Sequence, residues 1–438
     1  MSERQPTARA QAQGPVAYAE AKARAAREAS RRLAVLSRAE KDLALGHIAE
    51  ALQAAEGEIL AANARDMAAG ERAGMGTTLD RLLLTPQRIA AIRGQIAEVQ
   101  ALEDPVGREI DARERPNGLR IRRVRCPLGV VGIIYEARPN VTVDATVLCL
   151  KSGNAVVLKG GSDALESNRA VVAAIHQGLA RGAVSPEAVQ LLDSTDRAVT
   201  GAFLNLSGLI DVIIPRGGQG LIAFARQNAR VPVIETGASV VHAYVDETVD
   251  LPQAVALIHN SKCRRVSICN ALDTLLLHRA VADPVAAALG PLLAGNDPPV
   301  EVRADARALG PFAAAMPEGL VKPLDPARDF DTEFLDHVLA VGVVDSLDDA
   351  LAHIRAHSLQ HTEAIFTTDA ERAARFLHEV DAAAVMHNAS TQFTDGNEFG
   401  LGAEIGISTQ KLHVRGPFAL EGLTSSKWVV EGTGQLRP

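Results

Sequence analysis

The stretch that decides the fold is 128–135, which reads LGVVGIIY. It lacks the alternation of polar and apolar positions that marks a strand with one face in water. A continuous apolar run of this length is typical of a strand buried on both faces of a parallel sheet. We therefore expect this segment to form a central strand of an α/β domain.

Strands and helices alternate after this run. The pattern predicts strands at 155–158, 189–192, 212–214 and 231–234, and helices at 164–179 and 219–227. Such an alternation indicates a doubly wound α/β domain. A second α/β block is expected from about 255 to 406, with strands near Leu275 and at 338–344, 364–366 and 384–387.

Three segments outside these blocks have their own patterns. Residues 16 to about 100 are Ala-rich with helical periodicity, which predicts amphipathic helices. Residues 107–125 alternate charged and apolar positions around Asn117-Gly118, a hairpin signal. The arms of this hairpin are too polar for a core. The strand-like tail 426–430 would pair with it or with a neighbouring subunit.

Composition excludes several classes of protein. A length of 438 residues predicts two or three domains, and 47% hydrophobic residues indicate a globular chain. The net charge of −8 and an aromatic content of 3% argue against a broad nucleic-acid surface. No apolar run is long enough to span a membrane, and the N-terminus has no secretory h-region. With four cysteines and no CxxC pair, we expect reduced thiols in the cytoplasm and no metal site.

Two Gly-rich turns follow predicted strands. The run Lys159-Gly160-Gly161-Ser162 precedes a helix, with Asp163 and Glu166 spaced as a cap and its capping-box partner. Exposed N–H groups beside a lysine favour an anion, although an ordinary loop with a solvated lysine is an equal alternative. The second turn, at Gly217-Gly218, resembles a phosphate cradle without the GxGxxG spacing, and a plain tight turn is the favoured alternative.

Cys269 is the candidate nucleophile. Lys262, Arg264 and Arg265 lie within seven residues of it, and nearby positive charge favours the reactive thiolate. A buried structural cysteine is the common alternative. Cys263 stays open as a rival nucleophile, whereas the apolar settings of Cys126 and Cys149 favour structural roles.

Several motifs together resemble the gamma-glutamyl phosphate reductases, a branch of the aldehyde dehydrogenase superfamily. The matching stretches cover roughly residues 15 to 432: RCPLGVVG and YEARPN within 125–140, KSGNAVVLKGG at 151–161, Cys269-Asn270, HTEAI at 361–365, NAST at 388–391 and EFGLGAEIGIST at 398–409. No single stretch is specific, but the combination is. Leu359 departs from the pattern, since a small residue is expected there.

The resemblance implies an aldehyde dehydrogenase-like fold of three parts. An NADP-binding Rossmann-like domain would comprise 1–106 and 126–250. An α/β catalytic domain would comprise 251–409. A β-arm for oligomerisation, formed by 107–125 and 410–438, would supply the partner that the polar hairpin needs. A homo-oligomer is therefore expected.

The resemblance also implies a reaction. Cys269 would attack the acyl phosphate of L-glutamate 5-phosphate, phosphate would leave, and NADPH would reduce the resulting thioester to L-glutamate 5-semialdehyde. This step belongs to proline biosynthesis, and a glutamate 5-kinase that makes the labile substrate is a conceivable partner. Two alternatives stay open: an oxidising semialdehyde dehydrogenase of the same superfamily, and a non-catalytic cofactor-binding protein.

The resemblance assigns roles to further residues. Asn140 and the backbone N–H of Cys269 would stabilise the oxyanion. Glu235 lies where relatives keep a water-activating carboxylate, which reduction does not need, so it is expected to be structural or a thiol base. Expected cofactor ligands are Lys159 and Ser162, which favour NADPH, with Gly217, Gly218 and Glu333. Expected substrate ligands are Asn388, Ser390 and Thr391. Arg264 and Arg265 would hold the acyl phosphate or be solvated, and His361 would be structural.

Overall fold

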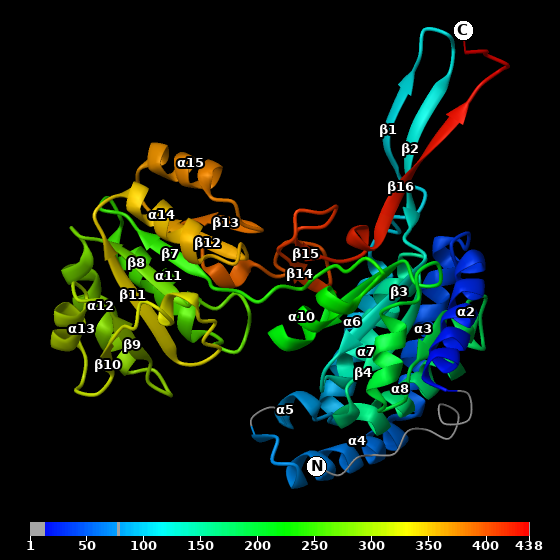
Figure 1. Cartoon of the computed structure of the whole chain (residues 1–438), viewed down its shortest axis with the longest axis horizontal. Coiled ribbons are helices and arrows are strands. Elements are labelled where there is room, and N and C mark those ends of the chain that lie inside the picture. Colours follow the sequence, from blue (N-terminus) through cyan, green and yellow to red (C-terminus); the bar gives the residue numbers. More distant parts are fainter. Residues whose placement is uncertain (1–13, 77–78, 438) are drawn as a thin grey trace. The chain divides into compact units, whose positions relative to one another are not determined.

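The structure, a computed structural model, describes residues 14–76 and 79–437 (Figure 1). The chain divides into two compact units. Unit 1 runs to Thr236 and includes Leu401–Gly406 and the segment from Phe418 onward, and unit 2 comprises Gly237–Gly400 and Ile407–Pro417. Residues 1–13 lie outside the described residues. Two predictions fall partly on them: the lack of a secretory h-region and the start of the cofactor domain at 1–106.

Unit 1 opens with the predicted Ala-rich helices. Small residues on α2, such as Ala19, Ala23 and Ala26, are fully buried and allow close packing. Ser37 and Glu40 form a complete capping box at the start of α3. The helices are α2 (Pro15–Leu33), α3 (Arg38–Ala54), α4 (Glu56–Arg72), α5 (Leu79–Leu82) and α6 (Pro86–Ala101).

The sheet of unit 1 is parallel, with strand order β5-β4-β3-β6. Its strands are β3 (Val130–Tyr135), β4 (Ala155–Gly160), β5 (Val189–Leu191) and β6 (Val212–Arg216), and its helices are α7 (Pro139–Lys151), α8 (Leu165–Leu179), α9 (Arg197–Phe203) and α10 (Gln219–Asn228). All six residues of β3 are buried, which confirms the central strand predicted from 128–135. The predicted strand at 231–234 is wrong: only an isolated bridge joins Val233 to Ile213.

The predicted hairpin is confirmed. Strands β1 (Glu109–Glu114) and β2 (Arg120–Pro127) pair antiparallel, and Gly118 adopts a φ of 82° in the turn. The tail strand β16 (Thr424–Glu431) pairs with the other side of β2, so the sheet order is β1-β2-β16 (Figure 1). The sequence left two partners open for this tail, the hairpin or a neighbouring subunit, and in the structure the tail pairs with the hairpin.

The sheet of unit 2 is also parallel, with strand order β10-β9-β11-β8-β7-β12-β13. Its strands are β7 (His242–Val245), β8 (Thr274–His278), β9 (Glu301–Ala304), β10 (Val321–Pro323), β11 (Val338–Val344), β12 (Thr362–Phe366) and β13 (Ala384–His387). The helices are α11 (Leu251–Cys263), α12 (Ala282–Ala294), α13 (Leu309–Ala315), α14 (Leu347–His357) and α15 (Ala370–Glu379). The chain also forms the short pair β14 (Gly406–Ser408) and β15 (Gly416–Phe418).

The boundary between the units differs from the predicted one. It lies after Thr236, not after residue 250, because β7 pairs with β8 and β12 in the sheet of unit 2. Near the C-terminus, 401–406 belongs to unit 1, whereas 407–417, which includes the first residues predicted for the arm, belongs to unit 2. Within the described residues, no helix is both long and apolar enough to cross a membrane.

Candidate active site

Cys269 lies in the turn-rich loop between α11 and β8, and its side chain is half-buried. The three nearby cations differ in their surroundings. Arg264 and Arg265 are exposed, whereas Lys262 is fully buried and donates to the backbone oxygen of Leu272 at 3.0 Å. Burial lowers the pKa of Lys262 to about 8, and the nearby Asp273 partly opposes this shift. With a pKa of about 8, Lys262 is still mostly protonated at neutral pH, so it contributes to the positive surroundings together with the two arginines.

The rival nucleophile Cys263 is the last residue of α11 and packs against the core of unit 2. Burial raises the pKa of its thiol to about 11, although Lys262 opposes the shift. Burial also raises the pKa of Cys149. Because the thiolate is the nucleophile, these surroundings disfavour both residues and leave Cys269 as the better candidate.

The predicted substrate residues have partners within unit 2. Asn388, at a φ of 49°, accepts from the backbone N–H of Thr367 and donates to its backbone oxygen, at 3.0 and 2.8 Å. Thr391 is fully buried and donates to the backbone oxygen of Asn270 at 2.7 Å. Ser390 is 3% exposed and accepts from the Ser261 hydroxyl at 3.2 Å. The structure therefore brings Ser390 and Thr391 to the cysteine loop, with their hydroxyls engaged.

Glu333 follows the short turn η4 (Asp329–Asp331) and accepts from the Ser239 hydroxyl at 3.0 Å. Burial raises its pKa. The next residue, Phe334, donates its backbone N–H to Asp273 at 3.0 Å. This carboxylate also accepts from the backbone N–H of Val241, so it ties the Glu333 segment to the strand region that precedes β7.

Asn140 lies in the first turn of α7 and donates its side-chain amide to Asp144 at 3.0 Å. Asp144 is a carboxyl that the sequence reasoning missed, although its i+4 spacing from Asn140 was a usable signal. Burial raises the pKa of Asp144 to about 6, against opposing hydrogen bonding from Asn140 and charge from Arg216. Glu235 follows the isolated bridge at Val233, and its carboxylate lies 3.6 Å from the guanidinium of Arg226.

Lys159 ends β4 as a largely buried ammonium, 9% exposed, that donates to the backbone oxygen of Gly160 at 2.9 Å. Burial lowers its pKa. Ser162 is exposed on the short turn η2 (Ser162–Ala164). Lys159 is thus part of β4 itself, and only Ser162 follows the strand.

The predicted cap at the start of α8 is wrong. The residue before the helix is Ala164, which makes no side-chain cap. Asp66 of α4 accepts instead from the backbone N–H groups of Glu166 and Ser167, at 3.4 and 2.8 Å. Asp163 is exposed, so its carboxylate is not held as the helix cap.

Comparison with known proteins decides the family. The aldehyde dehydrogenase family model matches residues 2–311. The gamma-glutamyl phosphate reductase of Novosphingobium aromaticivorans is 52% identical over 417 residues, which cover 95% of this chain and 96% of the relative. The crystal structure of gamma-glutamyl phosphate reductase from Thermotoga maritima has a TM-score of 0.91 at 43% identity, covering 96% of this chain and 100% of that one. The chain belongs to the gamma-glutamyl phosphate reductase family.

The fold and resemblance predicted for this reductase family member are therefore confirmed. An engineered glycolyl-CoA reductase with bound NADP+ shares the fold at a TM-score of 0.66 and 17% identity, covering 94% of this chain and 96% of that one. The aldehyde dehydrogenase family uses a nicotinamide cofactor, and two features of unit 1 bear on whether it can hold one.

Unit 1 of this reductase family member fits a nicotinamide cofactor. The strand order changes direction between β3 and β6, and open α/β sheets bind ligands beyond the carboxyl ends of their strands at such a point. At Gly217, on the turn after β6, a Cβ would lie 2.6 Å from the carboxylate of the exposed Glu136, so a larger residue would displace that side chain. Gly218 donates its N–H to the same carboxylate at 2.9 Å. Glu136 was not identified from the sequence.

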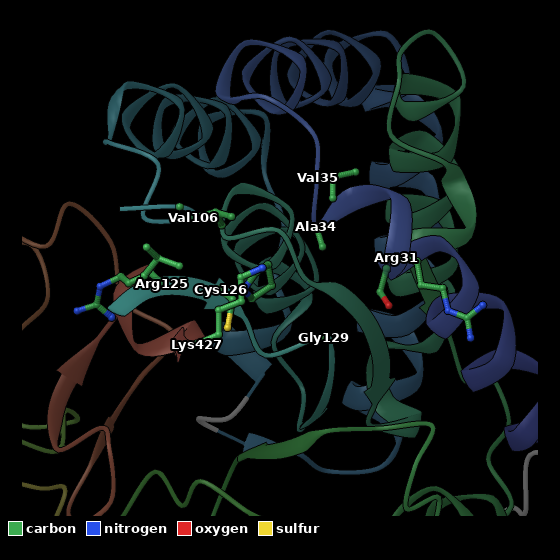
Figure 2. A pocket seen from close by; sticks show the side chains of 12 residues that line it. Arg31, Ala34, Val35, Val106, Arg125, Cys126, Gly129 and Lys427 are labelled. Atoms are coloured by element: carbon green, nitrogen blue, oxygen red, sulfur yellow. The ribbon is translucent and has the colours of Figure 1, made fainter. Parts of the chain in front are cut away.

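A separate pocket of about 430 Å³ lies at the base of the arm (Figure 2). Its lining includes Arg31 of α2, Val35 just beyond that helix, Cys126 of β2 and Lys427 of β16 (Figure 2). None of the predicted catalytic, cofactor or substrate residues lines it. This pocket is therefore distinct from the candidate active-site residues.

Proposed function

We propose that the protein reduces L-glutamate 5-phosphate to L-glutamate 5-semialdehyde and phosphate with NADPH, as a step of proline biosynthesis. The observation that carries this proposal is the near full-length identity of 52% to a gamma-glutamyl phosphate reductase. The chemistry of the cysteine loop also supports it. Cys269 is half-buried, follows two exposed arginines in the sequence and directly precedes the buried Asn270.

The mechanism begins with the thiolate of Cys269, which attacks the acyl carbon of the substrate. The carbon–oxygen bond to phosphate breaks, phosphate leaves with the electron pair, and a thioester remains on the sulfur. A bound nicotinamide cofactor supplies the hydride that reduction of this thioester requires. The carbon–sulfur bond then breaks, which releases the semialdehyde and returns Cys269 as a thiolate.

By resemblance to the family, two donors are proposed for the negative oxygen of the tetrahedral intermediates: the backbone N–H of Cys269 and the side-chain amide of Asn140. The hydrogen bond from Asn140 to Asp144 supports this assignment, because it engages one N–H of the amide and so fixes the orientation of the whole group. In the reductive reaction, Glu235 is proposed not to act as a water-activating base, since that reaction uses no water.

Selectivity for NADPH is proposed to depend on Lys159 and Ser162, with Gly217, Gly218 and Glu333 holding the rest of the cofactor. A lysine beside a small hydroxyl residue suits a 2′-phosphate dianion. The exposed Asp163 opposes this preference, because a carboxylate near the ribose repels the extra phosphate. Lys159 must therefore contribute the larger effect.

For the substrate, we propose that the 388–391 segment lines the side that takes the amino-acid end. The side chains of Asn388, Ser390 and Thr391 bond within the protein, as do the backbone N–H groups of Asn388 and Thr391, so the segment is proposed to shape this side of the site. The exposed Arg264 and Arg265 are candidates for the acyl phosphate.

The domain roles are also proposals. Unit 1 would hold the cofactor and unit 2 the nucleophile. The arm would join copies of the chain, because β16 is an edge strand that carries Trp428 and Val430 at 54% and 55% exposure. A cytoplasmic location and delivery of the labile substrate by a glutamate 5-kinase complete the proposal.

The deciding experiment runs the reaction in reverse. The semialdehyde is supplied in its cyclised form, and NADP+ reduction is measured with and without inorganic phosphate. The proposal expects turnover only when phosphate is present. Turnover without phosphate would indicate an oxidising semialdehyde dehydrogenase. NADPH binding without turnover in either condition would indicate a non-catalytic cofactor-binding protein.

A further inference from the structure

Gln392, on the short turn η5 (Thr391–Phe393), joins three points of the segment that precedes Cys269. Its side-chain oxygen accepts from the guanidinium of Arg264 at 3.0 Å. Its side-chain nitrogen donates to the backbone oxygens of Ser261 and Arg265, at 2.8 and 3.2 Å. The side chain is only 5% exposed, so these bonds are largely protected from water.

The same turn also binds the residue after Cys269. Asn270 donates its side-chain amide to the backbone oxygens of Gln392 and Thr394, at 3.2 and 2.9 Å. Thr391 returns a bond from its hydroxyl to the backbone oxygen of Asn270 at 2.7 Å. The cysteine is thus held from both sides by one short segment that lies more than 120 residues further along the chain.

The cysteine loop needs such support, because it contains no helix or strand between the end of α11 at Cys263 and the start of β8 at Thr274. Its conformation therefore depends on side-chain bonds from outside. A reacting group must be held within about 0.5 Å of its productive position. A displacement of about 1 Å can cost a hundredfold in rate.

We propose that Gln392 is a positioning residue for the reaction: it holds the loop so that the sulfur and backbone N–H of Cys269 meet the acyl carbon and its oxygen. It acts through Arg264, Arg265 and Asn270 and does not touch the substrate. This inference rests on the proposed function, since it concerns the rate of the same chemical step.

The amide is the right group for this position. It offers an acceptor to the guanidinium and two donors to the carbonyl oxygens at once. Glutamate would keep the acceptor but face the carbonyls of Ser261 and Arg265 without donors. Methionine has a similar length and volume and lacks strong donors and acceptors, so Gln392→Met removes the bonds while filling the space.

The test compares Gln392→Met with the matched control Gln190→Met. Gln190 is a buried glutamine of unit 1, 3% exposed, whose side chain donates to the backbone and side chain of Glu187 at 3.1 and 2.7 Å. The readouts are kcat, the KM for each substrate, and amide hydrogen exchange of the peptide 264–271. The inference expects kcat to fall at least tenfold in Gln392→Met, with KM values within threefold and faster exchange in that peptide. The control should keep the wild-type kcat and wild-type exchange there.

If Gln392→Met fails to fold, Thr391→Val replaces it, because this change removes only the bond to Asn270. The variant should have a lower kcat and KM values within threefold of wild type.

Wild-type kcat in Gln392→Met, or a lower kcat with unchanged exchange in 264–271, would overturn the inference. So would an equal loss of kcat in the Gln190→Met control. If the wild-type protein shows no phosphate-dependent turnover, the proposed function fails instead. Exchange of the 264–271 peptide then decides by itself whether Gln392 holds the loop.

Discussion

Asn140 donates its side-chain amide to Asp144 at 3.0 Å, one turn further along α7. The acceptor is a half-buried carboxyl whose pKa is raised to about 6 by its loss of contact with water. Asp144 therefore changes charge within the range in which an enzyme is ordinarily assayed. Its protonation alters the bond that orients the proposed oxyanion donor.

The first prediction concerns stability in Asp144→Asn. The folded pKa of about 6 exceeds the ordinary aspartate pKa of 3.8, so between these values the native state binds more protons than the unfolded chain. Stability contributed by this group is therefore lost as pH rises through that window. Asp144→Asn removes the half-buried charge, and the variant should melt at a higher temperature than wild type at pH 8. The difference should vanish below about pH 4, near the unfolded pKa.

Thermal melts across pH 4 to 8 test this expectation. Asp283→Asn is the matched control, because Asp283 is an exposed aspartate in the first turn of α12. A melting difference for Asp144→Asn that is the same at every pH would contradict the assigned cause.

The second prediction separates the two cysteines. Cys269→Ala should abolish turnover and leave NADPH affinity nearly unchanged, since the nucleophile is lost and the proposed cofactor residues of unit 1 are intact. Cys263→Ala should keep turnover. With a pKa of about 11 for its thiol, only about one Cys263 side chain in a thousand is a thiolate at pH 8. Turnover assays and NADPH titration on both variants give the answer, and activity kept in Cys269→Ala but lost in Cys263→Ala would reverse the assignment.

Strands buried on both faces were predictable from sequence. The segment 338–344 matches β11 residue for residue, because a continuous apolar run marks such a strand. The segment 384–387 matches β13, although that edge strand is only partly buried. The false strand at 231–234 contains Pro232, which has no N–H to donate to a ladder. The missed β7 is only four residues long and begins with a histidine, so it gave little signal.

The candidate site was predictable where a local pattern carried it. Cys269 could be chosen because its cations are close in sequence. The bonds of Gln392 to the cysteine loop join segments more than 120 residues apart, and no local pattern records them. The same reason explains the wrong cap: Asp66 reaches the start of α8 from a helix about 100 residues earlier.

The third prediction concerns cofactor selectivity. Lys159→Ala should weaken NADPH binding at least tenfold and NADH binding much less, because a charge-assisted contact to the 2′-phosphate is worth about 1.5 to 3 kcal/mol. Dissociation constants for both cofactors, measured by fluorescence titration, check this. Lys159→Met keeps most of the buried stem and serves as the control for lost packing. Equal weakening of both cofactors would mean that Lys159 does not read the 2′-phosphate.

The last prediction concerns Glu235, whose carboxylate lies 3.6 Å from the guanidinium of Arg226. A water-activating base would serve thioester hydrolysis, whereas the proposed reaction forms its thioester by losing phosphate and consumes it by reduction. A general base in use contributes about 10² to 10⁴ in rate. Glu235→Gln should therefore keep phosphate-dependent turnover within about tenfold of wild type, or about 1.4 kcal/mol in barrier.

Any phosphate-independent oxidation of the semialdehyde should fall much more in the same variant, because that reaction needs the activated water. Both activities must be measured on one preparation, with folding checked by NADPH binding. Arg226→Met, which removes the neighbouring guanidinium but keeps the carboxylate, separates loss of the ion pair from loss of the base. A fall of two or more orders of magnitude in the phosphate-dependent reaction of Glu235→Gln, absent from Arg226→Met, would instead make Glu235 the base that deprotonates Cys269.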